Sequence, residues 1–277
     1  ATGVTCVGVE QPGWRGVSET AQDAGMAIAA LAVDDQGLVV ERLDEHPGLG
    51  AVVVAPAHQY PSGAVLSPER RTALVAWARR TGALIVEDDY DAEYRYDRDP
   101  IGSLQGLAPD HVVYGGSASK SLAPGVRLGW LVAPGQLVEA MAALQGRRGG
   151  MPASLQQLAL ADLIERGELD RHLRRQRRDY RRRRDALLAA LAERLPEVAV
   201  HGAAAGLFLV VALPAGAGEE AVVAAARAVG LSLQGAGGET PALVIGYANL
   251  PEAAIAGVVD ALAAAVRGVR DPPAGGV

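Results

Sequence analysis

The sequence predicts an α/β protein, with a mostly parallel sheet in its first half and a smaller α+β domain after it. Short, unbroken runs of valine, isoleucine, leucine and alanine alternate with helical patterns through the first half, which is typical of parallel strands covered on both faces. This alternation stops near residues 145–152, and a long helical region follows. We therefore expect a large domain over residues 1–150, a small domain over 151–268 and a flexible tail over 269–277.

Six strands and three helices are expected in the first half. The strands are Thr5–Val9, Ala27–Val33, Ala51–Ala55, Ala83–Glu87, Val112–Tyr114 and Leu128–Val132, and the helices are Val17–Ala24, Pro68–Thr81 and Gly135–Leu144. The second helix has clear ends, because Ser67 can cap its first turn, Pro68 suits the first helical position, and Gly82 follows its last residue.

The second half mixes helices with strands. A helical region from Ala153 to about Leu195 should break near Gly167. After it we expect the strands Val198–His201, Leu207–Ala212 and Leu243–Tyr247, and the helices Glu219–Val229 and Pro251–Arg267.

Composition excludes several classes of protein. The 32 acidic residues outnumber the 26 basic ones, which argues against a general nucleic-acid coat. Cys6, expected to be a small buried strand residue, is the lone cysteine, so no disulfide can form within the chain and a reducing cytoplasm fits. We expect neither a membrane span nor a signal peptide, because the sequence has no membrane-length apolar run and no basic start followed by an apolar stretch. No metal site is expected.

One stretch is strongly basic: residues 171–184 carry nine arginines. Binding to DNA is one interpretation. The favoured one is a solvated helix face, with Leu173 and Tyr180 a heptad apart on its buried side, because so acidic a chain lacks other basic patches.

Lys120 is the only lysine in the chain, and the other 25 basic residues are arginines. A guanidinium stays protonated and cannot attack a carbonyl, whereas an amine can lose its proton. The retained lysine therefore indicates Schiff-base chemistry with an aldehyde cofactor, although a leftover surface lysine would look the same.

Four polar loops follow expected strand ends, where ligands bind in doubly wound sheets. We expect them to converge on one crevice. They are residues 11–14, 56–63, 87–91 and 115–127.

Each loop offers a group suited to an aromatic aldehyde phosphate. Asp88, or failing that Asp89, could pair with a pyridinium nitrogen, and Tyr90 could donate to a ring oxygen. Trp14 could stack on the ring. Their alternatives are an acidic loop or helix cap for the aspartates, and packing roles for the two aromatic residues.

The loop around Lys120 suits a phosphate. Ser117, Ser119 and Arg127 supply hydroxyls, backbone amides and a bidentate guanidinium, with helix caps and a surface arginine as the alternative. His58 is ambiguous: hydrogen bonding near the ring oxygen and loop packing are equally consistent with its position.

Taken together, these stretches resemble the pyridoxal 5′-phosphate (PLP) aminotransferases of fold type I, and more narrowly the aminotransferase-like domain of MocR/GabR transcription regulators. The matching pieces, spread over about residues 7–262, are Pro56–Gly63, Glu87–Tyr96, Ser119–Gly129, the arginine-rich stretch to Asp185, and Gly246–Leu250. The resemblance implies that Lys120 forms the internal aldimine, Asp88 meets the pyridine nitrogen and Tyr90 the ring oxygen. It likewise implies Arg127 and Ser117 on the phosphate, Trp14 on the ring, and a homodimer.

The chain departs from the family pattern in two ways. Family members begin with a winged helix-turn-helix and the early part of the large domain, which we expect to be missing here, so that DNA binding would need a domain absent from this chain. Aminotransferases of this fold also place an arginine for the substrate carboxylate about where Val244 stands. Arg15 or Arg95 could substitute for it.

Three functions follow from this resemblance. The favoured one is an effector-sensing domain that binds PLP through Lys120 and takes a small amine or amino acid as its ligand. The second is a working PLP-dependent aminotransferase in which Lys120 acts as general base. The third is a scaffold that has lost the cofactor.

Overall fold

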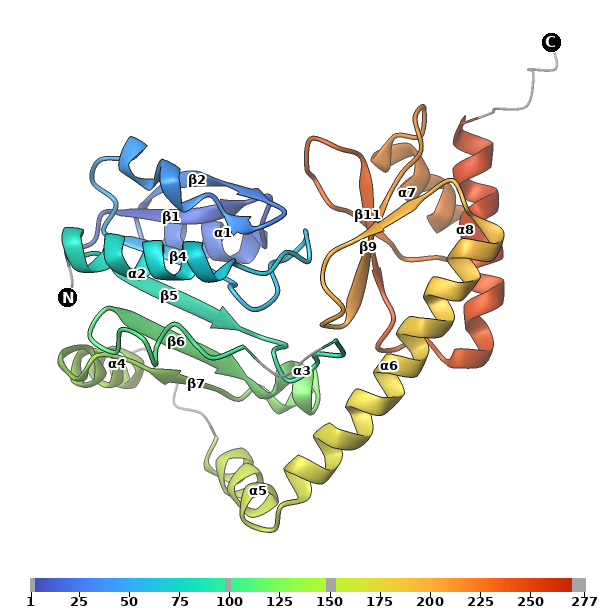
Figure 1. Cartoon of the computed structure of the whole chain (residues 1–277). Coiled ribbons are helices and arrows are strands. Elements are labelled where there is room, and N and C mark those ends of the chain that lie inside the picture. The colour runs from blue at the N-terminus through green and yellow to red at the C-terminus, as the bar shows by residue number, and fades with distance from the viewer. Residues whose placement is uncertain (1–2, 98–100, 148–152, 271–277) are drawn as a thin grey trace.

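The computed structural model describes residues 3–97, 101–147 and 153–270 (Figure 1). In its first half, seven strands form one sheet in the order β3-β2-β1-β4-β5-β6-β7. The strands β1, β2, β4, β5 and β6 pair in parallel, whereas β3 and β7 are antiparallel edges. The strands are β1 (Cys6–Gln11), β2 (Ala27–Asp34), β3 (Gly37–Leu38), β4 (Ala51–Val54), β5 (Leu84–Asp89), β6 (Val112–Ser117) and β7 (Gly129–Val132). The predicted α/β fold with a mostly parallel sheet is confirmed.

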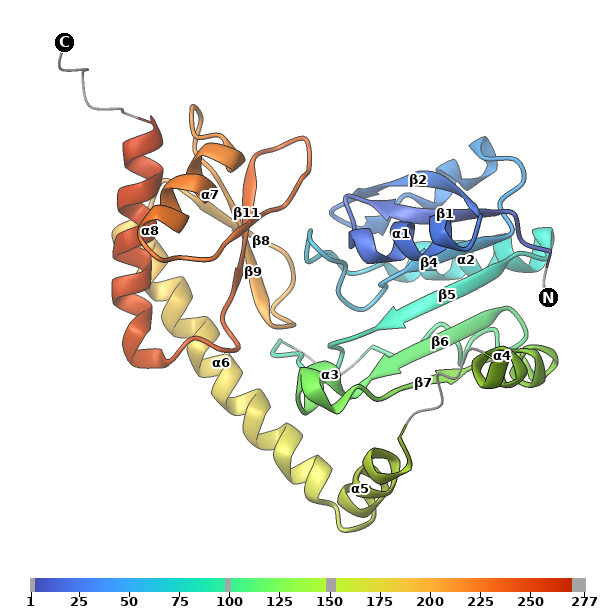
Figure 2. The ribbon, with the colours of Figure 1, turned by 180° about the vertical axis from the view of Figure 1, so that it is seen from behind.

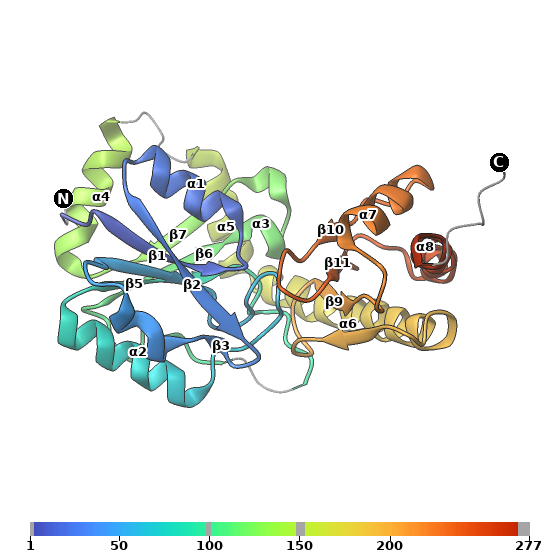
Figure 3. The same ribbon diagram turned by 90° about the horizontal axis from the view of Figure 1, so that it is seen from above.

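Helices lie on both faces of this sheet, as Figure 3 shows. They are α1 (Arg15–Asp23), α2 (Pro68–Thr81), α3 (Ala118–Ser121) and α4 (Gly135–Arg147), with a short 3₁₀ helix at Val40–Glu45 and another at Pro124–Val126. Successive residues of β4 point to opposite faces: Val52 joins a core with Leu74 of α2, whereas Val53 packs with Val17 of α1. Burial on both faces explains the unbroken apolar strand sequences.

The ends of α2 confirm the prediction. The Ser67 hydroxyl accepts a hydrogen bond of 3.3 Å from the Arg70 amide. Gly82 closes the helix with φ of 74°, a left-handed conformation that glycine adopts without steric cost.

In the second half, four strands form a separate sheet in the order β10-β11-β9-β8. They are β8 (Ala199–His201), β9 (Phe208–Ala212), β10 (Gln234–Gly235) and β11 (Ala242–Gly246), and the helices are α5 (Ser154–Glu165), α6 (Glu168–Arg194), α7 (Glu219–Ala228) and α8 (Ile255–Arg270), the last preceded by a 3₁₀ turn at Glu252–Ala254. Leu209, Leu243 and Ile245 pack in one core with Leu187 of α6 and Val259 of α8. Figures 1 and 2 show the two sheets side by side, with α8 on the outer side of the smaller one.

The predicted break in the long helical region is confirmed. Gly167 separates α5 from α6 with φ of 65°. The arginine-rich stretch lies in α6, where Tyr180 is half-buried and meets Tyr94 edge-on at 5.1 Å. Six of its nine arginines, including Arg174 and Arg178, are exposed. This arrangement agrees with a solvated helix face.

Several boundaries differ from expectation. The strand β5 extends to Asp89, and neither β3 nor the 3₁₀ helix at Val40–Glu45 was expected. Cys6 is half-buried rather than fully buried. The last helix reaches Arg270, so residues 269–270 of the expected tail are helical, while 271–277 and 148–152 lie outside the described residues. In the described part of the chain, no helix is long and apolar enough to cross a membrane.

Candidate cofactor site

A cavity of about 680 Å³ opens beyond the carboxyl ends of β1 and β4. The strands β1 and β4 are neighbours, but the chain passes from β1 to β2 on one side and from β4 to β5 on the other. The loops after β1 and β4 therefore diverge and leave a crevice between them. Its walls come from the loops after β1, β4, β5 and β6, and from β10 of the smaller sheet. The lining residues are Val9, Glu10, Gly13, Trp14, Val17, Val53, Val54, Ala55, Tyr60, Asp88, Tyr90, Ser117, Ser119, Lys120, Pro124, Arg127 and Gln234.

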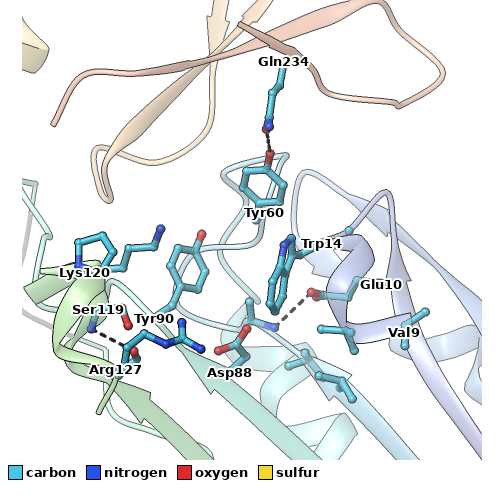
Figure 4. Close-up of a pocket in the computed structure, with 17 residues that line it drawn as sticks. Val9, Glu10, Trp14, Tyr60, Asp88, Tyr90, Ser119, Lys120, Arg127 and Gln234 are labelled. Carbon is cyan, nitrogen blue, oxygen red and sulfur yellow. Dashed lines mark hydrogen bonds between the residues drawn. The ribbon is translucent and has the colours of Figure 1, made fainter. Parts of the chain in front are cut away.

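The structure brings seven of the eight predicted site residues to this cavity. They are Trp14, Asp88, Tyr90, Ser117, Ser119, Lys120 and Arg127. In Figure 4 the Lys120 amine points toward Tyr90 on one side of the cavity. Trp14 lies on the opposite side, and Asp88 lies between Tyr90 and Trp14. Four separate loops therefore meet, as the sequence predicted from their positions after strands.

Asp88 is the more suitable of the two candidate aspartates. Burial, and after it the negative charges of Asp89 and Asp91, raise the pKa of Asp88 to about 6. Among the described residues no group donates a hydrogen bond to its side chain, so a cationic ligand group would complete its surroundings. Asp89 instead accepts hydrogen bonds from the Tyr114 hydroxyl at 2.7 Å and from the Ala92 amide at 3.3 Å, and does not line the cavity.

Trp14 forms an open aromatic wall. It is the residue before α1, and 64% of its surface is exposed, which excludes the core-packing role considered for it. A flat ring on a cavity wall can stack on another aromatic ring.

Arg127 has a strained backbone. Its φ of 52° makes it the one non-glycine residue with positive φ in the described part of the chain. Such a conformation costs on the order of 1–3 kcal/mol and is concentrated at functional sites. Arg127 lines the cavity together with Ser117 and Ser119, and the Ser117 hydroxyl accepts a hydrogen bond of 3.1 Å from the Ser119 amide.

His58 is the predicted site residue that does not line the cavity. Its buried ring contacts Asp91 through Nδ1 at 2.9 Å and lies 4.7 Å from the Phe208 ring. The Tyr90 hydroxyl donates a hydrogen bond of 2.8 Å to the His58 carbonyl oxygen. The geometry therefore gives His58 the packing role left open above, behind Tyr90, because Asp91 and Phe208 enclose its ring.

Three polar residues of the cavity were not among the predicted site residues. Glu10 lies near the end of β1 and accepts a hydrogen bond of 3.2 Å from the Ala55 amide, and burial raises its pKa to about 7. Because Glu10 directly follows the expected strand Thr5–Val9, its position after a strand could have indicated that it lies in the site. Tyr60 lies in the loop after β4 and Gln234 in β10 of the smaller sheet. A hydrogen bond of 2.7 Å joins them, and no sequence pattern connects them.

The chemistry of these groups fits PLP. A primary amine can bind its aldehyde, an aspartate can meet its ring nitrogen, an indole can cover its ring, and a guanidinium with two serines can hold its phosphate. Each of these groups is present on the cavity wall, in Lys120, Asp88, Trp14, Arg127, Ser117 and Ser119.

Comparison with known proteins identifies the family. The model of class I and II aminotransferases matches residues 5–262. The chain belongs to the class I and II aminotransferase family. The α-aminoadipate aminotransferase LysN from Thermus thermophilus, solved with N-(5′-phosphopyridoxyl)-L-leucine, superposes with a TM-score of 0.87 at 26% identity, over 96% of this chain and 72% of LysN. The predicted fold and cofactor are confirmed by this membership and this likeness.

Transcription regulators are among the relatives in sequence. The chain is 35% identical to the HTH-type regulator YhdI of Bacillus subtilis, over 90% of this chain and 54% of YhdI. It is 38% identical to the pyridoxine biosynthesis regulator PdxR of Corynebacterium glutamicum, over 74% of this chain and 44% of PdxR. MocR of Rhizobium meliloti, a probable rhizopine catabolism regulator, is 36% identical over 65% of this chain and 37% of MocR. The predicted resemblance to MocR-type regulators is confirmed, and the chain spans about half the length of these relatives, or less.

Proposed function

We propose that this chain is the PLP-binding, effector-sensing part of a MocR-type transcription regulator. The observation that carries the proposal is the position of the sole lysine, Lys120, on the wall of a cavity that also presents Asp88, Trp14 and Arg127. The names of YhdI and PdxR, both HTH-type regulators, support regulation over turnover. In this proposal DNA is bound by another part of a longer protein, the assembly is a homodimer, and the location is the cytoplasm.

The cofactor-binding unit would be residues 1–150 and the smaller unit residues 151–268. PLP supplies an aldehyde that condenses with amines and a ring that withdraws electrons. The chain's own residues divide the remaining work. Arg127, Ser117 and Ser119 would hold the phosphate, Asp88 would keep the ring nitrogen protonated, and Trp14 would fix the plane of the ring.

The experiment tests attachment at Lys120. The protein is mixed with PLP, reduced with borohydride and digested, and the modified peptide is identified by mass spectrometry. We expect one adduct per chain, on Lys120. Lys120→Arg keeps the positive charge and cannot form the bond, so it should give no adduct. Equal labelling of the wild type and of Lys120→Arg would contradict the proposal.

A working aminotransferase is the second candidate, favoured by the likeness to LysN. Lys120 would then move the proton at the substrate's α-carbon. Incubating the PLP-loaded protein with an amino acid and a 2-oxo acid separates the two functions. Product equal to no more than one amino group per chain fits a sensor, and many turnovers fit the enzyme.

A further inference from the structure

The wall of the cavity that belongs to the smaller sheet has no positive charge. The two faces of that sheet differ: Leu209, Leu243 and Ile245 point to the core with α6 and α8, so their neighbours in the strands point the other way. Phe208 is on this second face, because its ring lies 5.4 Å from that of Tyr60. Val244 has the same orientation, since it lies between Leu243 and Ile245.

Gln234 extends this face to the cavity. It is the register partner of Val244 in the antiparallel pair of β10 and β11, and directly opposed side chains share a face. Its side chain accepts the hydrogen bond from the Tyr60 hydroxyl and lines the cavity. On this side of the cavity a ligand therefore meets the Gln234 amide and the Tyr60 phenol. The Phe208 ring packs against Tyr60, and Val244 is the register partner of Gln234.

Basic residues are scarce throughout this part of the chain. Between Leu195 and Val266 the sequence contains one arginine and no lysine: Arg227, which is exposed in the last turn of α7. The one histidine in this range, His201, pairs with Val210 at the edge of the sheet and does not line the cavity. The two arginines considered above as substitutes do not line the cavity either: Arg15 is exposed at the start of α1, and Arg95 is buried with its Nε 3.0 Å from an Asp97 oxygen.

The charged groups that line the cavity are few, and most of them have a partner on the cofactor. The lining has two acids, Glu10 and Asp88, and two bases, Lys120 and Arg127. With the cofactor's phosphate on Arg127, the described lining has no second guanidinium for a ligand carboxylate. Lys120 is displaced when a ligand amine takes its place on the cofactor, and Asp88 is occupied by the ring nitrogen. A neutral hydroxyl or amide on the ligand would instead find matching partners in Gln234 and Tyr60.

We infer that the ligand of this cavity is a primary amine whose other end is neutral and polar, not a carboxylate. The inference rests on the proposed function, because it takes PLP as the group that binds the amine. It restricts the ligand class from amino acids to amino alcohols, amino amides and similar amines.

The experiment compares a matched pair, L-alaninol and L-alanine, with the PLP-loaded protein. Each is titrated against the cofactor's absorbance and, separately, by calorimetry. The same pair is titrated against free PLP, so that the intrinsic reactivity of each amine can be divided out. We expect L-alaninol to bind about tenfold more tightly than L-alanine after this correction.

Two arginine variants test the location. Val244→Arg places a cation on the cavity-facing side, and should remove or reverse the preference. Val200→Arg is the matched control. Val200 pairs with Val211, a member of the core on the other face, and is 37% exposed, so the added charge should leave the preference unchanged.

The outcomes are distinguishable. L-alanine binding as tightly as L-alaninol, or a preference that Val200→Arg shifts as much as Val244→Arg does, would overturn the inference and leave PLP binding intact. Failure of the protein to take up PLP would overturn the proposed function, and this inference with it.

Discussion

The Tyr94 hydroxyl donates a hydrogen bond of 2.5 Å to the side-chain oxygen of Gln176, and so joins the turn after β5 to helix α6. Tyr94 is fully buried, and its hydroxyl also lies 3.3 Å from the carbonyl oxygen of Lys120. His172 of α6 contacts the Ser121 carbonyl oxygen at 3.0 Å. Contacts from Tyr94 and from His172 of α6 therefore fix the position of the short helix α3, which carries Lys120.

Removing the Tyr94 hydroxyl should weaken this connection. We expect Tyr94→Phe to lower the free energy of unfolding by about 1–2 kcal/mol, because the Gln176 oxygen loses a donor at a half-buried position. Urea denaturation measures the change. Tyr180→Phe is the control, since Tyr180 meets Tyr94 only through its ring; it should cost less than about 0.5 kcal/mol. Equal losses in the two variants would contradict the role given to the hydrogen bond.

Gly206 should not tolerate a side chain. Its φ is 71°, and a Cβ atom there would overlap the His58 ring and the Asp91 carboxylate. We expect Gly206→Ala to lower the free energy of unfolding by about 3 kcal/mol or more, from strain and overlap together. Gly25→Ala separates the two causes, because Gly25 has φ of 78° with nothing within 4 Å of a Cβ, and should cost about 1 kcal/mol. Thermal unfolding of both variants gives the comparison, and similar losses would argue against tight packing around His58.

Glu10 should make the cofactor-free protein less stable at higher pH. Burial raises its pKa from 4.5 to about 7, so between these values the folded state binds more protons than the unfolded state does. The protonated Glu10 side chain therefore favours the folded state, and this contribution to stability is lost as the pH rises from about 4.5 to about 7. Glu10→Gln removes the titration and can still accept from the Ala55 amide.

We therefore expect the free energy of unfolding of Glu10→Gln to be about 1–3 kcal/mol higher than that of the wild type at pH 8. At pH 4 we expect no such difference. Chemical denaturation across this pH range measures it. A gain that is the same at both pH values would show that the Glu10 carboxyl does not titrate as described.

Arg127 should contribute to cofactor affinity through charge. Arg127→Gln is expected to weaken PLP binding by about 10- to 100-fold, since a guanidinium–phosphate pair is a charge-assisted contact. Fluorescence titration measures the dissociation constant. Arg178→Gln removes one positive charge from the exposed face of α6 and should leave affinity unchanged. A comparable loss in both variants would indicate that net charge, not the Arg127 contact, sets affinity.

The sequence was sufficient for most of the sheet, for a physical reason. Strands such as Ala51–Val54 are buried on both faces and so are apolar throughout, and α2 has a cap at one end and glycine at the other. The same logic explains why seven of the eight predicted residues line the cavity, because polar loops after parallel strands meet at one edge.

The rest depended on contacts between distant segments. Tyr60 and Gln234 are 174 residues apart, and no local pattern indicates that they share a cavity wall. The same is true of His58, whose place behind Tyr90 depends on Phe208 from the other sheet. Local sequence specifies which residues can bind a cofactor, but not which of them the tertiary packing covers.

The position of Lys120 has a consequence for covalent modification. Enzymes and metabolites that acylate lysine side chains would find a single target in these 277 residues, and that target lies on the cavity wall. No other lysine in the given sequence competes for such a reagent. In the proposed function, one acyl group on Lys120 would therefore be enough to prevent the attachment of PLP.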